Sequence, residues 1–468
     1  MTTAKAFAGK HYAVLGLARS GLATVEALLA SGARVTAWDD KEEARSSLLR
    51  SNGEGDHPQD GGGASNVGSL APPRPASPAV PLPTGSARRE ELEVANFLDS
   101  DLSRFDSIVV TPGLPLNRHP IAQRAVEAGV EIIGDIELFA RARPELPPHK
   151  VVGITGTNGK STTTALVHHI LKTAGVPAAM GGNIGLPILA QDPLPEGGVY
   201  VLELSSYQID LTTSLDCDVA VLLNITPDHL DRYESFEAYA ASKARLFKMQ
   251  SRSHHGIFGA DDRVVKKMVA LDWSDKPADH WHHALTDIIE VGRYPALDGL
   301  HNAQNSSASI EVCRLLGISD DQIDQGLKSY PGLPHRMERV RDKDGVTFVN
   351  DSKATNPTAT APALAAFEKI RWICGGRPKS DNLDECAPFF GHVRKAYTVG
   401  EAGELFASLL SPHMDVAQCG TLERAVAEAA AEAESGDTVL LSPACASFDQ
   451  FRDFEDRGDQ FRELVGAL

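Results

Sequence analysis

KVVGITGTNGKST, residues 150–162, is the stretch that decides the fold of this chain. An apolar run of strand length at 150–155 leads into a glycine-containing turn at 156–159, and a helical pattern continues from 161 until Gly175 stops it. A strand that enters a helix through such a turn gathers loop N–H groups and the helix N-terminus in one place, which favours phosphate. The stretch therefore predicts a nucleoside triphosphate site in an α/β domain.

Two side chains of this turn add chemistry of their own. Lys160 would neutralise the β- and γ-phosphates of ATP, and the Ser161 hydroxyl would reach Mg²⁺. The strict GxxxxGK[ST] pattern has Gly where this chain has Ile154. A plain glycine turn with a helix cap is the alternative, but it does not require a lysine beside two hydroxyl residues. The predicted ATP-binding residues of this stretch are Gly156, Thr157, Asn158, Gly159, Lys160, Ser161 and Thr162.

Length and composition limit the rest of the chain. At 468 residues the chain exceeds one ordinary core, and roughly 150 residues per domain suggests about three domains. No apolar run approaches the ~20 residues that span a bilayer, and the first residues lack a signal-peptide pattern, so we expect a cytoplasmic protein without a membrane partner. A net charge of −18 argues against nucleic-acid binding. The six cysteines are widely spread, which is typical of reduced structural thiols.

The N-terminal part reads as strand, turn, helix and strand at 12–15, 16–21, 22–31 and 34–38. The turn resembles GxGxxG with Ala18 at the middle glycine, and Asp39 follows at a distance suited to a ribose contact. NAD or another nucleotide could bind there. Residues 51–86 are rich in Gly, Pro, Ser and Ala and predict a disordered surface insertion.

Breaks in the pattern divide the chain further. Prolines at 144, 147 and 148 indicate one linker, and the segment 330–334 indicates another. Apolar runs of strand length occur at 199–204 and 219–225 before the second break, and at 346–349, 371–374, 395–399 and 438–441 after it. We predict an α/β protein with a Rossmann-like domain at 1–143, a central P-loop ATPase-like domain at 144–332 and a C-terminal Rossmann-like domain at 333–468.

Polar residues follow two apolar strands of the central domain. Glu203 lies near the end of one, where a carboxylate is costly unless it pairs or binds a metal, and His229 follows the next. A lone His is usually structural, but adjacent strand ends would bring both residues to one crevice. Lys243 lies on a later helix, and by itself it would most often be a solvated surface lysine.

Three segments of the last domain concentrate charge or hydroxyls at strand ends or linkers, at 333–336, 350–356 and 442–448. Each could be a simple turn, because Asn, Asp and Ser favour turns. Together with Lys379 they predict a pocket for a carboxylate.

The whole set of motifs resembles the Mur ligase family. The resemblance covers nearly the full chain and rests on residues 134–139, 156–162, 181–185, 203–206, 228–232, 333–336, 350–356 and 442–451. TGTNGKST is also the sequence that the phosphate loop has in this family, without the first glycine of the strict pattern. Ile154 at that position therefore supports the resemblance. The segments 350–356 and 442–451 resemble most closely the members that add D-glutamate.

The resemblance implies an ATP-dependent amide ligase of peptidoglycan precursor synthesis that joins D-glutamate to UDP-N-acetylmuramoyl-L-alanine. It implies two Mg²⁺ sites and a carbamylated Lys243, with Lys160, Lys243 and His229 as catalytic residues. We expect the protein to be a monomer. The resemblance implies metal contacts from Ser161, Glu203, His229 and Lys243, and further ATP contacts from Asn305, Arg336, Asp351 and Lys353. It places UDP-substrate contacts at Gly16, Arg19, Ser20, Asp39, Thr111, Pro112, Gly113 and Asn183, and D-glutamate contacts at Thr355, Lys379, Ser447 and Phe448. Arg377 stands where the family commonly has Asp.

The implied chemistry is an acyl phosphate formed from ATP and then attacked by the amine of D-glutamate, inside domains that close about residues 330–334. His229 or a nearby carboxylate would take the amine's proton. Two other classes of function remain open. A NAD-dependent oxidoreductase built on residues 16–21 would leave Lys160 and Glu203 unexplained, and a nucleotide-gated binding protein without chemistry would not need Glu203, His229 and Lys243 together.

Overall fold

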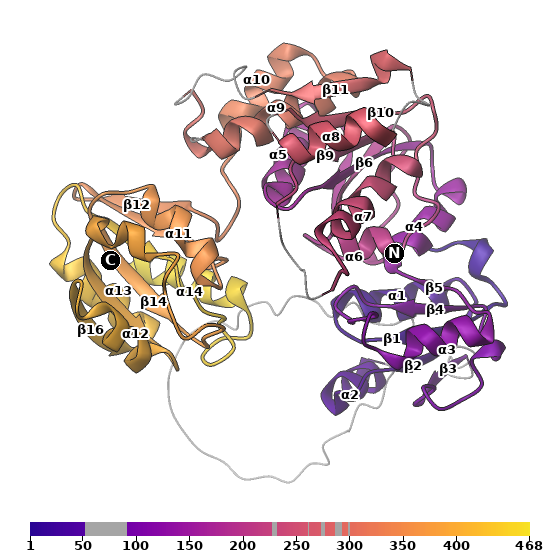
Figure 1. Ribbon diagram of the computed structural model, residues 1–468, viewed down its shortest axis with the longest axis horizontal. Coiled ribbons are helices and arrows are strands. Elements are labelled where there is room, and N and C mark those ends of the chain that lie inside the picture. Colours follow the sequence, from indigo (N-terminus) through magenta and orange to yellow (C-terminus); the bar gives the residue numbers. More distant parts are fainter. Residues whose placement is uncertain (52–90, 227–231, 261, 273–276, 286–292, 298–299) are drawn as a thin grey trace, which may run out of the picture. The chain divides into compact units, whose positions relative to one another are not determined.

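The computed structural model describes residues 1–51, 91–226, 232–260, 262–272, 277–285, 293–297 and 300–468. These residues form two compact units, Met1–Tyr330 and Pro331–Leu468 (Figure 1). The insertion predicted at 51–86 lies outside the described residues except for Ser51, and His229 also lies outside them.

The N-terminal sheet of the first unit is parallel, with strand order β3-β2-β1-β4-β5. Side chains alternate along β1, so that Tyr12 and Val14 pack into one apolar cluster while Ala13 and Leu15 pack into another, and both faces of the sheet are covered. Its elements are β1 His11–Leu15, α1 Arg19–Ala30, β2 Arg34–Trp38, α2 Glu42–Ser51, β3 Leu92–Val94, β4 Ser107–Val110, α3 Pro120–Ala128, β5 Ile132–Ile133 and α4 Asp135–Ala142.

The central sheet of the same unit is also parallel, with order β11-β10-β9-β6-β8-β7. β6 lies between β9 and β8, so the loops after these three strands are neighbours at one edge of the sheet (Figure 1). Its elements are β6 His149–Thr155, α5 Lys160–Thr173, β7 Ala178–Gly182, β8 Gly198–Glu203, α6 Ser206–Asp210, β9 Val219–Leu222, α7 Phe236–Lys248, β10 His255–Gly259, α8 Arg263–Asp272, β11 Trp281–Ala284, α9 Leu300–Leu315 and α10 Asp320–Ser329.

Helix α4 joins the two sheets of the first unit. Phe139 of α4 packs edge-on against Tyr200 of β8, with ring centroids 5.0 Å apart, inside a core cluster that both sheets share. The buried carboxylate of Glu137 on the same helix accepts hydrogen bonds from the backbone N–H groups of Thr213 and Ser214 at 2.8 and 3.0 Å. The N-terminal and central sheets are therefore held together by both apolar packing and a buried polar contact.

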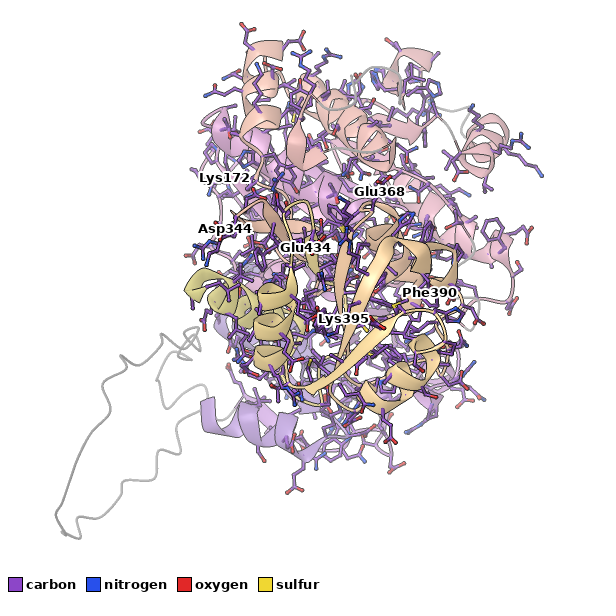
Figure 2. All side chains as sticks on the ribbon, turned by 90° about the vertical axis from the view of Figure 1, so that its left-hand side faces the viewer. Lys172, Asp344, Glu368, Phe390, Lys395 and Glu434 are labelled. Atoms are coloured by element: carbon purple, nitrogen blue, oxygen red, sulfur yellow. The ribbon has the colours of Figure 1, made fainter. Side chains whose placement is uncertain are left out.

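The second unit is one six-stranded sheet of order β12-β13-β17-β14-β15-β16, in which β12 is antiparallel to β13 and the remaining pairs are parallel. Lys395 of β15, labelled in Figure 2, donates from Nζ to both carboxylate oxygens of Glu432 at 2.7 and 2.8 Å. The elements are β12 Glu338–Lys343, β13 Val346–Asn350, α11 Pro357–Ala365, β14 Ile370–Gly375, β15 Val393–Val399, α12 Gly403–Leu410, β16 Asp415–Gly420, α13 Leu422–Glu432, β17 Thr438–Leu441 and α14 Phe454–Ala467.

The predicted α/β class with three sheets is confirmed, and each of the bounds 1–143, 144–332 and 333–468 encloses one sheet; the bounds themselves stay predictions. Several strands were not predicted, because they are short, glycine-containing or polar rather than long apolar runs: the edge strands β3, β5, β7, β11, β12 and β16 and the internal strand β10. All six cysteines are buried. None of the helices among the described residues is long and apolar enough to cross a membrane.

Candidate active site

The phosphate loop after β6 depends on glycine at two positions. Gly156 and Gly159 have φ of 154° and 84°, a backbone region that favours glycine. A Cβ placed on Gly159 would collide with Oδ1 of Asn305, a buried residue of α9. Asn305 also accepts from the Thr163 hydroxyl at 3.4 Å, so α9 supports the start of α5. The structure thus places Asn305 beside the loop, and its contact with ATP stays a prediction.

Asn224, which follows β9, holds the loop from its other side. Its backbone O accepts from Thr157 N at 2.9 Å, its Oδ1 accepts from Asn158 N at 2.8 Å, and its Nδ2 donates to Asn158 O at 3.2 Å. Asn224 lies near the end of the apolar run predicted at 219–225, and no role was predicted for it. Its position after a strand adjacent to β6 was the available signal.

Two lysines meet at one carbonyl oxygen of this loop. Lys160 donates from Nζ to the O atoms of Gly156 and Thr157 at 2.9 and 2.8 Å, and Lys243 of α7 donates from Nζ to Gly156 O at 3.0 Å. Lys243 is only 2% exposed, and its Nζ lies 4.7 Å from the centre of the Tyr239 ring. The expectation of a solvated surface lysine, drawn from Lys243 alone, is therefore wrong: the packing of α7 against the central sheet buries it.

Glu203 ends β8 directly beside Ile154 of β6. It is 2% exposed, and its Oε1 accepts from Asn183 Nδ2 at 2.9 Å, whereas Oε2 has no hydrogen-bond partner among the described residues. A buried carboxylate oxygen left unpaired is costly, and it fits a hard cation that prefers oxygen ligands. The buried hydroxyl of Ser161 suits the same chemistry. No group of three His, Cys, Asp or Glu side chains in the described part of the chain is arranged to hold a metal.

The N-terminal glycine turn is tied down by Asp39. Its Oδ2 accepts from Leu17 N of the turn at 2.7 Å and its Oδ1 from Lys41 N at 2.9 Å, so both oxygens of the predicted ribose contact already accept from backbone N–H groups. Gly16 has φ of 94° and lies against Thr111, which follows β4.

Burial raises the pKa of Asp135 to about 6. Asp135 helps to line a small pocket at this end of the sheet, together with Val14, Ser20, Gly21, Thr24, Val109, Val110, Thr111 and Pro112.

Arg232 connects the N-terminal turn region to the central sheet. It donates from Nη2 to Gly113 O at 2.7 Å and from Nη1 to Leu114 O at 3.0 Å, and its guanidinium stacks 4.6 Å from the centre of the Tyr207 ring. Arg232 comes just after the segment that contains His229. The structure therefore places Gly113, one of the predicted UDP-substrate contacts, beside Arg232, which follows the predicted metal ligand His229 by three residues in the sequence.

In the second unit, the predicted D-glutamate residues are partly assembled. Lys379 donates from Nζ to Thr355 Oγ1 at 3.3 Å, Ser447 is buried and Phe448 is 62% exposed. Arg377, which stands where the family commonly has Asp, pairs with Glu401 at 3.0 Å. The segments that carry Lys379 and Ser447 are bridged through the backbones of residues 377 and 446.

Arg457 of α14 organises these segments and was not predicted. It is 2% exposed and donates to Ser352 Oγ at 2.9 Å, to Ser352 O at 2.9 Å and to Cys445 O at 3.1 Å. Burial lowers its pKa to about 10. No motif in the sequence marks it, because its partners lie up to 105 residues away.

The predicted nucleotide-side residues of this unit lie close together but differ in exposure. Arg336 is exposed, whereas Asp351 is 4% exposed and uses both carboxylate oxygens, accepting from Met337 N at 3.1 Å and from Ser442 Oγ at 2.8 Å. Burial raises the pKa of Asp351 to about 7. The Lys353 Nζ lies 5.6 Å from the centre of the Phe454 ring.

Three sheets in an α/β arrangement, with a glycine-containing phosphate loop beside two lysines and a buried carboxylate, are typical of a nucleotide-binding α/β enzyme. Residues 154–281 match the Mur ligase middle domain, and residues 335–445 match the glutamate ligase domain of the same family. Among solved structures, the fold is similar to the UDP-N-acetylmuramate-alanine ligase MurC of Thermotoga maritima, with a TM-score of 0.56 at 16% identity over 98% of this chain and 99% of that one. A MurF ligase from Thermotoga maritima in complex with ADP gives a TM-score of 0.54 at 20% identity over 75% of this chain and 92% of that one.

The chain belongs to the Mur ligase family. It is similar over its full length to proteins named UDP-N-acetylmuramoylalanine--D-glutamate ligase. The protein of Novosphingobium aromaticivorans is 56% identical, with 97% of its length covered. Those of Sphingopyxis alaskensis and Zymomonas mobilis are 53% and 51% identical, with 100% of each covered.

Proposed function

We propose that this chain is the cytoplasmic ligase that uses ATP to join D-glutamate to UDP-N-acetylmuramoyl-L-alanine. The observation that carries the proposal is the meeting of Lys160 and Lys243 at Gly156 O, beside a strand whose buried Glu203 has one oxygen without a partner among the described residues. Neither a NAD-dependent oxidoreductase nor a binding protein without chemistry accounts for these three groups together. The full-length similarity to D-glutamate ligases supplies the identity of the substrates.

On the ATP side, the N–H groups of the loop and the start of α5 would bind the phosphates. Lys160 would turn from the carbonyls of Gly156 and Thr157 to the β- and γ-phosphates, and Asn305 would stay beside Gly159. The second unit would add Arg336, Asp351 and Lys353, of which Arg336 is the exposed cation.

Two Mg²⁺ ions would be held by Ser161, Glu203, His229 and a carbamylated Lys243. Carbamylation would convert the Lys243 ammonium into an anionic carbamate with oxygen ligands, which suits its burial beside the loop. Bound Mg²⁺ would offset the negative charge that gathers on the transferring phosphoryl group.

The reaction follows in two steps. An oxygen of the L-alanine carboxylate attacks the γ-phosphorus of ATP, and the bond from that phosphorus to the β-phosphate oxygen breaks. ADP is the leaving group, and the product is an acyl phosphate. The neutral amine of D-glutamate then attacks the acyl carbon, the carbon–oxygen bond to phosphate breaks, and the amine loses a proton as the amide forms. Lys160 would stabilise charge in the first step, and His229 or a nearby carboxylate would take the proton in the second.

The remaining residues would bind the two other substrates. Gly16, Arg19, Ser20, Asp39 and residues 111–113 would hold the UDP end, with Asn183 nearer the reacting carboxylate. Asp39 would act mainly by fixing the turn, since Leu17 N and Lys41 N already occupy its oxygens. Thr355, Lys379, Ser447 and Phe448 would bind D-glutamate, with the Lys379 ammonium opposite a substrate carboxylate. The domain bounds 1–143, 144–332 and 333–468 and a monomeric state belong to the same proposal.

The test is phosphate release from ATP with UDP-N-acetylmuramoyl-L-alanine and a panel of amino acids. We expect release with D-glutamate and none with L-glutamate, L-lysine, L-alanine or meso-diaminopimelate. Release with another amino acid and none with D-glutamate would contradict the proposed substrate, and no release with any would contradict the proposed reaction.

A further inference from the structure

The turn that carries Arg336 has an unusual backbone. His335 and Met337, the residues on either side of Arg336, have φ of 60° and 48°. The left-handed region is unfavourable for residues with a Cβ and persists only where the surrounding structure holds it. The side chain of Arg336 is exposed and makes no hydrogen bond or ion pair with other described residues. The strained backbone therefore presents an exposed cation that no hydrogen bond or ion pair ties to the described residues.

Two carboxylates hold the two left-handed residues. Glu338 Oε2 accepts from His335 N at 2.9 Å, and Asp351 Oδ1 accepts from Met337 N at 3.1 Å. The carbonyl of His335 accepts from Lys353 N at 2.9 Å. The backbone on both sides of Arg336 is thus fixed by side chains and backbone from β12 and from the segment after β13.

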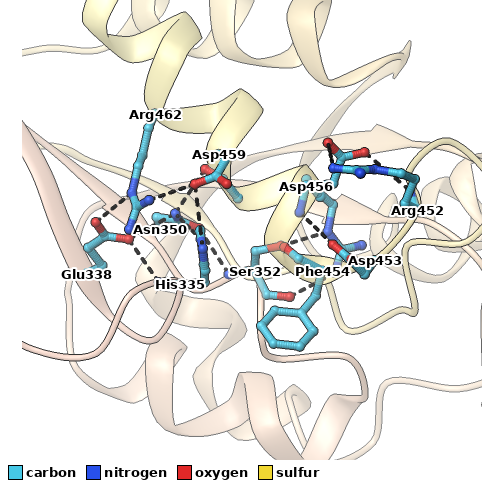
Figure 3. A network of polar contacts seen from close by, with 12 residues as sticks. His335, Glu338, Asn350, Ser352, Arg452, Asp453, Phe454, Asp456, Asp459 and Arg462 are labelled. Carbon is cyan, nitrogen blue, oxygen red and sulfur yellow. Dashed lines mark hydrogen bonds and ion pairs between the residues drawn. The ribbon is translucent and has the colours of Figure 1, made fainter. Parts of the chain in front are cut away.

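Glu338 is held in turn by Arg462 of the last helix, α14, as Figure 3 shows. Arg462 of α14 donates from Nε to Glu338 Oε1 at 2.8 Å and from Nη1 to Asp459 Oδ1 at 2.6 Å. Asn350 donates from Nδ2 to Glu338 Oε2 at 3.1 Å. The Glu338 and Arg462 side chains are 18% and 34% exposed, so their pairing is less screened by water than a surface ion pair.

The imidazole of His335 rests on α14 at Gly458. A Cβ on Gly458 would overlap Nδ1 of the ring, and this Nδ1 lies 3.1 Å from Asn350 Nδ2 (Figure 3). His335 is 5% exposed, and burial lowers its pKa, which favours the neutral ring as an acceptor for the Asn350 amide. The turn is therefore seated on α14 by a ring as well as by the Glu338–Arg462 pair.

We propose that Glu338 and Arg462 are positioning residues that hold the His335–Met337 backbone so that Arg336 is presented to ATP. The inference rests on the proposed function, in which Arg336 binds the nucleotide. Neither Glu338 nor Arg462 touches substrate in this scheme. Their effect reaches ATP only through the orientation of Arg336.

The experiment compares Arg462→Met with Arg424→Met, a control that removes an arginine of α13 whose Nε donates to Glu428 at 2.6 Å in an exposed pair. We expect Arg462→Met to raise the KM for ATP about tenfold, the size of effect of one lost charge-assisted contact, while the KM values for D-glutamate and the UDP substrate stay within twofold. Arg462→Lys, which keeps the charge, should recover part of the loss. Arg424→Met should match the wild type.

Direct titration of each variant with β,γ-imido-ATP, followed by calorimetry, separates the two proposals. Weaker binding of this analogue by Arg462→Met but not by Arg424→Met supports the positioning role, whatever the catalytic outcome. Equal binding by both variants, or an equal rise in all three KM values, would overturn it. A wild-type chain that binds the analogue but releases no phosphate with D-glutamate would overturn the proposed function and leave the binding comparison valid.

Discussion

The phosphate loop and the Arg336 turn both present a cation, but they stabilise their backbone conformations in different ways. Each places a cation, Lys160 or Arg336, on backbone that includes positive φ angles. In the loop these angles belong to Gly156 and Gly159, which adopt them at little cost, whereas in the turn they belong to His335 and Met337. The loop conformation is thus encoded locally, and the turn conformation depends on contacts made elsewhere in the second unit.

This difference predicts where each region is vulnerable. The loop is held by backbone groups and by Asn224, all at the end of one sheet. The turn depends on Glu338, Asp351 and, through Arg462, on the last helix of the chain. Substitutions in the loop should act directly on chemistry, whereas substitutions around the turn should act through backbone conformation and stability.

The largest effect is expected in the loop. Lys160→Ala should lower kcat by about 10²- to 10³-fold, because a positioned positive charge is lost from the transferring phosphoryl group. Lys172→Ala, an exposed residue in the last turn of the same helix, is the matched control and should keep wild-type activity. Initial rates of phosphate release at saturating substrates measure both. A fall in kcat of less than threefold in Lys160→Ala would show that Lys160 does not stabilise the transferring phosphoryl group.

A substitution of Glu203, at the end of β8, tests the proposed Mg²⁺ site. Glu203→Gln keeps an acceptor for Asn183 but loses the charge, so the Mg²⁺ concentration for half-maximal activity should rise at least about tenfold. In EDTA the variant should unfold at a higher temperature than the wild type, since it no longer buries an unpaired carboxylate. The exposed Glu196→Gln is the control. An unchanged Mg²⁺ requirement would argue that Glu203 serves only to hold Asn183.

The same contrast explains what the sequence could predict. The loop, its strand and its helix were predicted within one or two residues, because glycine, lysine and apolar runs are local signals. Lys243 was singled out only by family resemblance, since burial of a helical lysine is decided by the sheet it packs on. The contacts that hold the turn around Arg336 escaped prediction, because Glu338, Asn350 and Arg462 come together across up to 124 residues.

Asp351 should give the turn a dependence on pH. Burial raises the pKa of Asp351 to about 7, above an unfolded value of about 3.9, so the stability from its protonation is full below pH ~4 and is lost as the pH rises through about 7. Asp351→Asn mimics the protonated form and keeps an acceptor for Met337 N. The variant's stability relative to the wild type should therefore increase by about 4 kcal/mol from pH 4 to pH 8, since one pKa unit corresponds to about 1.4 kcal/mol.

Urea unfolding of both chains at a series of pH values measures this difference. The exposed Asp381→Asn in the same unit should keep a constant difference from the wild type over the same range. A constant difference for Asp351→Asn as well would mean that the carboxylate is ionised in the folded chain across this range.

The smallest effect tests the strain in the turn itself. Met337 is 36% exposed with φ of 48°, so Met337→Gly removes a left-handed penalty of about 1–2 kcal/mol while adding the roughly 0.5–1 kcal/mol entropy cost of glycine. The second unit should gain about 0.5 kcal/mol, a rise of about 1–2 °C in its Tm by calorimetry. Met337→Ala is the control, because it loses the same side chain but keeps the penalty, and it should gain nothing. A gain in alanine equal to that in glycine would show that the side chain, and not the backbone, carries the cost, and the turn would then resemble the phosphate loop in having no strain for Glu338 and Asp351 to hold.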